Sequence, residues 1–236
     1  MAIVGLDREQ SFALLAEMTS TRNLLAYGVR VIRTAAFIET TRDPIFTMLS
    51  IGVEKLYKLT LGLAALDRDG TWPTKAEMMA NGHKLAEMHP VILGELRART
   101  ANRSEYVRGL VAQVEADPVI PPTIAALDAY GRSGRFYYLD LLGDAPQSWE
   151  SPDAFWQRIE AAALADPGVG AAYAAAMADI SNGALWDAFL VALNGRIAAS
   201  IEALWLMIAV CGRNHALGDP GGVFGFEVHP DAVGRQ

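Results

Sequence analysis

Hydrophobic residues recur at steps of three and four along the N-terminal part of the chain, which is the spacing of one helical face. This pattern predicts a first long helix over residues 9–39. A second long helix is predicted from Asp43-Pro44 to the turn at 67–70, because Asp caps free amides and Pro tolerates the first helical position. The apolar positions of the two helices are Phe12, Leu15, Met18, Leu25, Val29, Ile32 and Ala36, then Ile45, Leu49, Leu56, Leu59 and Leu63.

The clearest element is a last long helix, in which apolar residues step by four and three almost as in a heptad seam. Polar residues interrupt the segment 184–212, so it is predicted to be a core helix rather than a membrane span. Gly212 is predicted to cap its end. The seam consists of Trp186, Leu190, Leu193, Ile197, Ile201, Leu204, Ile208 and Cys211.

The middle of the chain predicts shorter helices joined by turns rich in Pro, Gly and Asp. Thr74 and Glu77 have the spacing of a capping box, and further helices are predicted over 83–101, 104–116 and 123–130 and after Ser151. The segment 135–142 is ambiguous, because its aromatic residues also suit a strand.

These elements predict an all-α helical bundle. Residues 1–216 are expected to form a single helical domain, with 104–180 as a candidate insertion or subdomain. Residues 217–236 are rich in Gly and Pro and show little periodicity, which predicts a loose C-terminal tail or an arm that extends across a neighbour.

Composition narrows the classes of function. The chain has 20 Lys and Arg against 27 Asp and Glu, a net charge of -7, which disfavours nonspecific binding to DNA or RNA. The single cysteine, Cys211, excludes a disulfide within the chain and is predicted to be a buried thiol. A signal peptide and a membrane span are not expected, which leaves the cytoplasm as the default location. His83 and Glu87 are four residues apart but stand alone, so neither a metal site nor a cofactor is predicted.

Two polar clusters in the first half of the chain are candidate ligand sites. Glu54 and Lys58 are an i, i+4 pair beside Lys55; the alternative is an ordinary solvated helix face. His83 and Lys84 follow a Gly turn that opens a helix, and free amides at a helix start bind anions; the alternative is an ordinary turn.

A third polar cluster, Arg213-Asn214-His215, follows the apolar seam directly. The guanidinium of Arg binds phosphate, and His moves protons near neutral pH, so Arg213 and His215 are candidate catalytic residues and Asn214 a candidate ligand contact. The alternative is a C-terminal cap, in which basic groups interact favourably with the helix dipole.

The stretch Leu49–Leu59, then Trp72-Pro73 and then Gly82-His83-Lys84-Leu85, resembles the HEPN family (higher eukaryotes and prokaryotes nucleotide-binding) over residues 49–88. Arg135, followed by Phe-Tyr-Tyr-Leu-Asp, adds a further similarity and is a candidate ligand contact. The resemblance implies a dimerising helical domain linked to RNA cleavage, nucleotide binding, or toxin-antitoxin and phage-defence systems. HEPN ribonucleases carry Arg followed by four to six residues and then His, a spacing that is absent from this chain.

Three functional hypotheses follow. The first is a HEPN-like homodimer that binds a nucleotide or RNA without the usual ribonuclease motif, through Glu54, Lys58 and His83. The second is a structural or interaction protein whose seam from Trp186 to Cys211 pairs with a partner. The third is an RNA-cleaving enzyme that uses Arg213 and His215 across a dimer interface.

Overall fold

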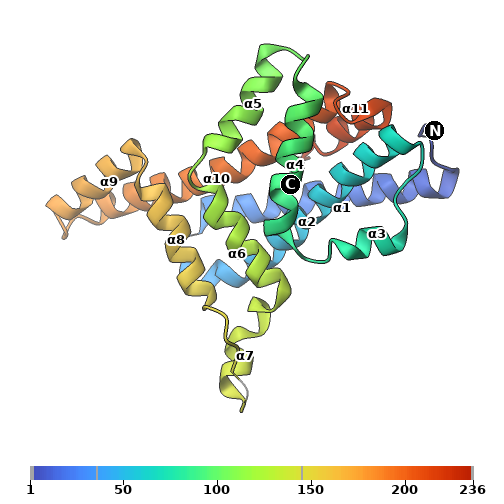
Figure 1. The fold of residues 1–236 in the computed structure, drawn as a ribbon. Helices are drawn as coiled ribbons and strands as arrows, with labels where there is room; N and C mark the ends of the chain where they lie inside the picture. The colour runs from blue at the N-terminus through green and yellow to red at the C-terminus, as the bar shows by residue number, and fades with distance from the viewer. Residues whose placement is uncertain (1–2, 36, 145, 235–236) are drawn as a thin grey trace.

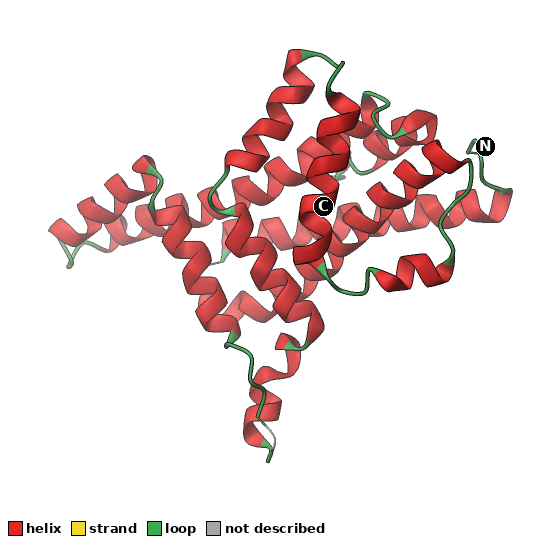
Figure 2. Ribbon diagram, in the orientation of Figure 1, coloured by secondary structure: helices red, strands yellow, loops and turns green. Residues whose placement is uncertain are grey.

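A computed structural model describes residues 3–35, 37–144 and 146–234. The described residues form helices joined by short loops and contain no β-strand (Figure 2). The prediction of an all-α fold is therefore confirmed. Ala36, which the predicted first helix included, and the last two residues of the predicted tail lie outside the described residues.

Three long helices form the centre of the molecule: α1 (Arg8–Thr34), α2 (Ile38–Asp69) and α10 (Gly183–Arg213). Helix α1 packs along α2, and α10 packs against α1 (Figure 1). Most of the apolar positions predicted from the periodicity meet in the core, where Met18, Leu56 and Ile208 are buried, whereas Phe12 and Leu190 remain exposed. Burial of apolar side chains on several helices at once is the main stabilising term of such a bundle.

Shorter helices surround this centre. Helices α4 (Leu85–Thr100) and α6 (Ile120–Arg132) cover α2, and α3 (Lys75–Ala80) precedes them. Helix α5 (Glu105–Ala116) packs on α10, and α8 (Pro152–Leu164) packs on α6. Helix α7 (Tyr137–Leu142) projects from one end of the molecule (Figure 1). Val107, Ile124 and Trp156, all from the stretch 104–180, belong to the same buried cluster as α1 and α2.

The second helix begins earlier than the sequence pattern predicts. Helix α2 starts at Ile38 rather than at Asp43-Pro44, and Pro44 lies inside its first turns. Proline there removes one backbone hydrogen bond, but its fixed φ suits the helix. Ile38 is buried and the hydroxyl of Thr40 donates to the carbonyl of Phe37, so the extra turn is stabilised by packing and by a local bond.

The ambiguous segment 135–142 is helical and not a strand. A short 3-10 turn, Gly134–Phe136, leads into α7, and no neighbouring strand exists among the described residues for it to pair with. An isolated strand forms no backbone hydrogen bonds of its own, whereas a turn of helix forms some of them locally. Its aromatic side chains do not pack in a sheet: Phe136 and Tyr138 are about half exposed to solvent.

The prediction of a loose C-terminal tail is wrong for the described residues. Residues 218–227 form helix α11 (Gly218–Glu227), followed by a 3-10 turn, Pro230–Ala232. Phe224 and Val228 are fully buried, and the indole of Trp205 donates to the carbonyl of Val228. Helical periodicity was hard to see here because glycines supply no apolar side chains, although they let two helices approach closely.

The contact between α10 and α11 also corrects the role of Gly212. Helix α10 continues through Gly212 to Arg213, and Asn214 is its cap. A Cβ atom at Gly212 would lie 2.8 Å from the carbonyl oxygen of Gly221, and one at Gly225 would overlap the backbone of α10. Gly212 is therefore required for close helix packing and not for a left-handed cap.

Candidate functional site

The structure brings Glu54, Lys58 and His83 together. Lys58 Nζ lies 2.7 Å from Glu54 Oε1 on α2, and His83 Nδ1, in the turn before α4, lies 2.6 Å from Glu54 Oε2. The carboxylate of Glu54 is largely buried, so it is shared by two basic groups in a partly desolvated position. The proximity predicted for Glu54 and His83 is present, but the charge of Lys58 is already balanced.

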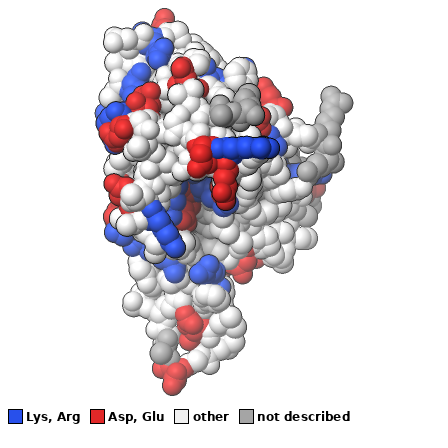
Figure 3. Space-filling model, turned by 90° about the vertical axis from the view of Figure 1, so that its right-hand side faces the viewer, with Lys and Arg blue, Asp and Glu red and all other residues white. Residues whose placement is uncertain are grey.

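A second group of ion pairs begins at Lys84, the residue after His83. Lys84 Nζ lies 3.1 Å from Glu87, Arg132 lies 3.8 Å from Glu87, and Arg132 Nε lies 3.0 Å from Asp128. Asp128 also accepts a hydrogen bond of 3.1 Å from the amide of Ala86 at the start of α4, so a side chain already occupies that helix terminus. Acidic and basic groups are also interspersed over the face of the molecule in Figure 3.

We call the set Glu54, Lys58, His83, Lys84, Glu87, Asp128 and Arg132 the ion-pair network. It joins α2, the turn before α4, α4 and α6. Each of its Lys and Arg side chains lies beside a carboxylate, and the hollow next to Lys84 and Glu87 has a volume of only about 270 Å³. This arrangement stabilises the packing of helices and leaves little positive charge for an anionic ligand.

A larger hollow than this one lies elsewhere in the described structure. It is an open groove of about 930 Å³ between α5, α10, α11 and the 3-10 turn at Pro230–Ala232. Of the predicted candidates Arg213, Asn214 and His215, the first two line this groove and His215 does not. The full lining is Tyr106, Ala199, Glu202, Ala203, Leu206, Val210, Arg213, Asn214, Phe226, His229, Pro230 and Asp231.

Arg213 is held in this groove by an aromatic ring. Its guanidinium carbon lies 4.4 Å from the centre of the Phe226 ring, a cation–π contact, and no carboxylate among the described residues forms an ion pair with it. Phe226 is 59% exposed and Tyr106 is 63% exposed, so two aromatic rings face solvent in the groove. The side-chain amide of Asn214 donates a hydrogen bond of 2.8 Å to the carbonyl of Val210, and this bond orients the side-chain oxygen of Asn214.

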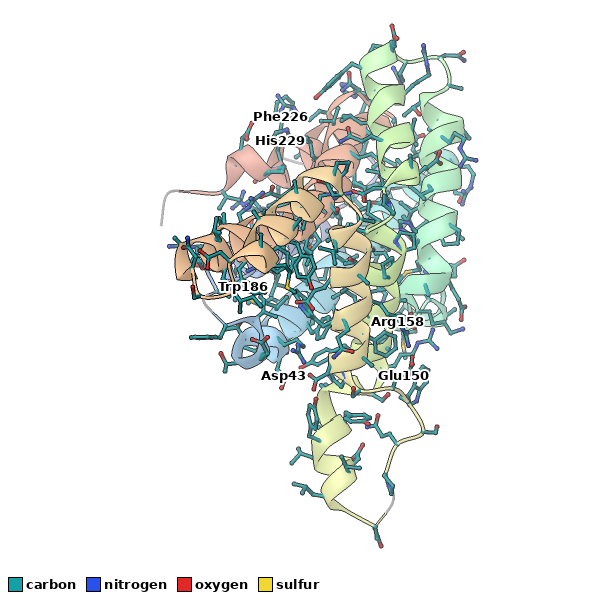
Figure 4. All side chains as sticks on the ribbon, turned by 90° about the vertical axis from the view of Figure 1, so that its left-hand side faces the viewer. Asp43, Glu150, Arg158, Trp186, Phe226 and His229 are labelled. Atoms are coloured by element: carbon teal, nitrogen blue, oxygen red, sulfur yellow. The ribbon has the colours of Figure 1, made fainter. Side chains whose placement is uncertain are left out.

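His229 is the residue that the sequence analysis missed. It lies between α11 and the final 3-10 turn, close to Phe226 (Figure 4), and is 8% exposed. Its Nδ1 accepts a hydrogen bond of 3.1 Å from the amide of Asp231, which places the proton of the neutral ring on Nε2. Burial lowers the pKa of His229; the charge of Arg213 also lowers it, and Asp231 opposes them.

His229 lies within residues 217–236, which were predicted to form a loose tail, so no sequence signal marked it as part of a site. Its spacing from Arg213 is set by helix α11, which turns the chain back along α10. A histidine brought near an arginine by such a reversal is visible only in three dimensions.

His215 and Arg135 lie elsewhere. His215 has a left-handed backbone with φ of 55°, its Nδ1 lies 3.4 Å from Asp219, and its carbonyl accepts from Arg103. The proposed pair of Arg213 and His215 is therefore not assembled within this chain. The guanidinium of Arg135 lies 5.1 Å from the ring of Phe136, and Arg135 belongs neither to the groove nor to the ion-pair network.

Cys211 is buried, and burial raises the pKa of its thiol to about 12, as expected for a core cysteine. No group of three or more His, Cys, Asp or Glu side chains that could hold a metal ion occurs among the described residues. Helix α10 is long and apolar enough to cross a membrane, but 67% of its most apolar window is buried within the protein, as in a core helix.

No protein-family model, no curated protein and no solved structure matches this chain. The groove is therefore interpreted from its own chemistry.

Proposed function

We propose that this chain is a HEPN-like helical domain that binds a nucleotide or an RNA end in the groove lined by Arg213, Phe226 and His229. The observation that carries the proposal is an arginine that has no carboxylate partner among the described residues and is held on an exposed aromatic ring inside this groove of about 930 Å³. The resemblance over residues 49–88 supports the same class of ligand, although its motif residues lie in the ion-pair network.

The groove residues match the parts of a nucleotide. The guanidinium of Arg213 suits a phosphate, because its planar fork donates two parallel hydrogen bonds to phosphate oxygens. The exposed rings of Phe226 and Tyr106 suit a base, since base–aromatic stacking contributes about 1–3 kcal/mol per base. Asn214 and His229 Nε2 add polar groups that can bind base edges or a phosphate oxygen.

The charge of the groove favours a short ligand over a long polyanion. Glu202 and Asp231 line the same groove, and Glu202 is paired with Arg33. A long nucleic acid needs many cations along its path, which the net charge of -7 does not supply. A mononucleotide or a terminal phosphate needs only one or two positive groups.

The position of the proton on the neutral ring of His229 favours binding over RNA cleavage. Cleavage at a 2′-hydroxyl needs a base that accepts a proton, and His229 has its Nδ1 engaged with the amide of Asp231 and its proton on Nε2. In that state the ring is a hydrogen-bond donor to a ligand. The alternative, cleavage by Arg213 and His215 across a dimer interface, does not use this groove, since His215 does not line it.

The test is a titration of a short fluorescein-labelled single-stranded RNA, with adenosine monophosphate as a competitor. Arg213→Ala is expected to weaken binding about tenfold or more, because a hydrogen bond to a charged group contributes about 1.5–3 kcal/mol. The matched control is Arg68→Ala, which removes an exposed arginine outside the groove. Equal affinities of the two variants, or no binding by the unmodified protein, would contradict the proposal, and shortening of the RNA would favour an enzyme.

A further inference from the structure

Helix α9 (Pro167–Ala178) and the first turns of α10 form a hairpin that projects from the body of the molecule (Figure 1). We call residues 167–191 the projecting hairpin. Helix α9 contains no charged residue, yet only Val169 and Ala176 are buried. A helix that is apolar on all sides is normally buried, so this one lacks a cover in the single chain.

The inner side of the projecting hairpin is well packed. Tyr173 on α9 lies with Trp186 and Phe189 on α10 in an aromatic cluster, with ring centres 5.1–6.5 Å apart. The indole of Trp186 donates a hydrogen bond of 3.2 Å to the carbonyl of Ile180, and this bond closes the turn between the helices. Figure 4 shows Trp186 on this projecting part, away from Phe226 and His229.

The outer side of the projecting hairpin remains exposed and apolar. Val191 is 69% exposed and Ile180 is 68% exposed. Isolated apolar residues on a surface are normal, but a continuous apolar face marks an interaction site. The exposed apolar positions outside the aromatic cluster are Ala171, Ala174, Ala175, Met177, Ala178, Ile180, Ala184, Ala188, Leu190 and Val191.

The charges around this face exclude several partners. No Lys, Arg or His occurs between residues 159 and 195, whereas Asp179 and Asp187 are both exposed near the tip. A surface with acidic residues and no basic ones is repelled by nucleic acid and by anionic lipid. The partner must therefore offer an apolar face that does not depend on attraction by basic groups.

We propose that a second copy of this chain covers the projecting hairpin, so that two hairpins pack about a two-fold axis into a four-helix arrangement. Such an interface is isologous, and every copy carries the required apolar face. In an antiparallel arrangement the two tips lie at opposite ends, so the carboxylate of Asp179, in the turn between the helices, does not meet that of the partner. The exposed alanines let helices approach closely.

The size of the exposed face of the projecting hairpin fits a second copy of the chain. A stable interface takes about 20–30 residues from each partner, and most positions of the hairpin, residues 167–191, are exposed or partly exposed. The heptad-like seam of α10 does not provide the face along its whole length, because Ile197, Ile201 and Ile208 are buried in the chain's own core. Only its first turns are available to a partner.

Sedimentation velocity over a series of protein concentrations tests the proposal. The unmodified protein is expected to be a dimer in the micromolar range, and Val191→Glu is expected to raise the dissociation constant at least about tenfold, since it places a charge in an apolar interface. Ala175→Glu, on the other helix of the hairpin, is expected to act in the same direction. Val91→Glu is the matched control, because Val91 is 55% exposed on α4, outside the hairpin.

Circular dichroism establishes that each variant is folded before its association is compared. A monomer at every concentration, or a dimer that neither hairpin variant weakens, would overturn the proposal. Binding of the monomer to neutral phosphatidylcholine vesicles that is lost in Val191→Glu would also overturn it, because the face would then be a lipid contact. RNA binding by folded monomeric variants is a separate readout, so failure of the dimer proposal leaves the groove proposal standing.

Discussion

The ion-pair network and the groove use similar residues in opposite ways. In the network, Lys58 and His83 share the carboxylate of Glu54, and Arg132 lies 3.0 Å from Asp128. In the groove, Arg213 lies on the ring of Phe226 and has no carboxylate partner among the described residues. The first arrangement balances its charge internally, and the second leaves a cation for an incoming ligand.

This difference shows that a basic residue in a suggestive motif is a weak guide to a binding site. The residues that resemble the HEPN family, Glu54, Lys58 and His83, are engaged in joining helices. The capacity of the groove to bind an anion depends on how few carboxylates lie near Arg213 and on the exposed aromatic rings beside it. Three substitutions or conditions test whether the two regions are as distinct as their contacts indicate.

The largest effect is expected from Gly225→Ala. The added methyl group would overlap the amide of Arg213 and the carbonyl of Ala209, so α11 must move and carry Phe226 away from the groove. We expect a loss of about 1–3 kcal/mol in the free energy of unfolding and a loss of RNA binding. Urea denaturation and the RNA titration measure the two effects.

Gly195→Ala is the matched control for this change. Gly195 lies inside α10, and nothing lies within 4 Å of an added Cβ atom. Because Ala favours the helix, the variant is expected to be up to about 1 kcal/mol more stable, with unchanged binding. Equal effects of the two substitutions would show that α11 does not pack on α10 through its glycines.

A smaller effect is expected from Glu54→Gln. The change removes the negative charge shared by Lys58 and His83, and we expect a loss of about 0.5–1 kcal/mol of stability, because His83 is exposed and the pair is screened by solvent. RNA affinity should stay the same, since Glu54 is outside the groove. A marked change of affinity with little change of stability would place the ligand in the network instead; Glu77→Gln, at an exposed helix cap, is a control for stability.

The smallest effect is expected from pH. Burial lowers the pKa of His229, so the neutral ring predominates near neutral pH, and an anionic ligand favours the protonated ring. Affinity for a short RNA, whose phosphodiesters do not change charge in this range, should therefore rise modestly as the pH falls through the ordinary histidine value of about 6.5 and below it. His229→Gln should remove this dependence, and a slope that persists in the variant would assign the titration to another group.

Stability should change in the opposite direction over the same pH range. Burial lowers the pKa values of both His89 and His229, and the hydroxyl of Tyr57 lies 2.6 Å from His89 Nδ1, which accepts its proton only when neutral. The unfolded chain then binds more protons than the folded one, so stability falls as the pH falls through about 6.5. Affinities are therefore compared only where circular dichroism shows a folded protein.

The sequence by itself determined the helical class and the main core. Apolar residues at steps of three and four can face one direction only in a helix, so Met18, Leu56 and Ile208 were assigned to buried faces and are buried. The buried state of Cys211 followed in the same way from its place in the last seam. Local signals such as the capping box of Thr74 and Glu77 were equally readable, because both partners lie within one turn.

Only the tertiary structure decided what lies together at a distance. Gly221 and Gly225 carry no side chain that could reveal a helix, yet their lack of a Cβ atom lets α11 lie against α10. That contact brings His229 and Phe226 to the groove lined by Arg213, and it separates His215 from it. The spacing of residues along the chain determines which of them share a helix face. Which faces meet depends on how closely two backbones approach, and here glycines, which have no side chain, allow that approach.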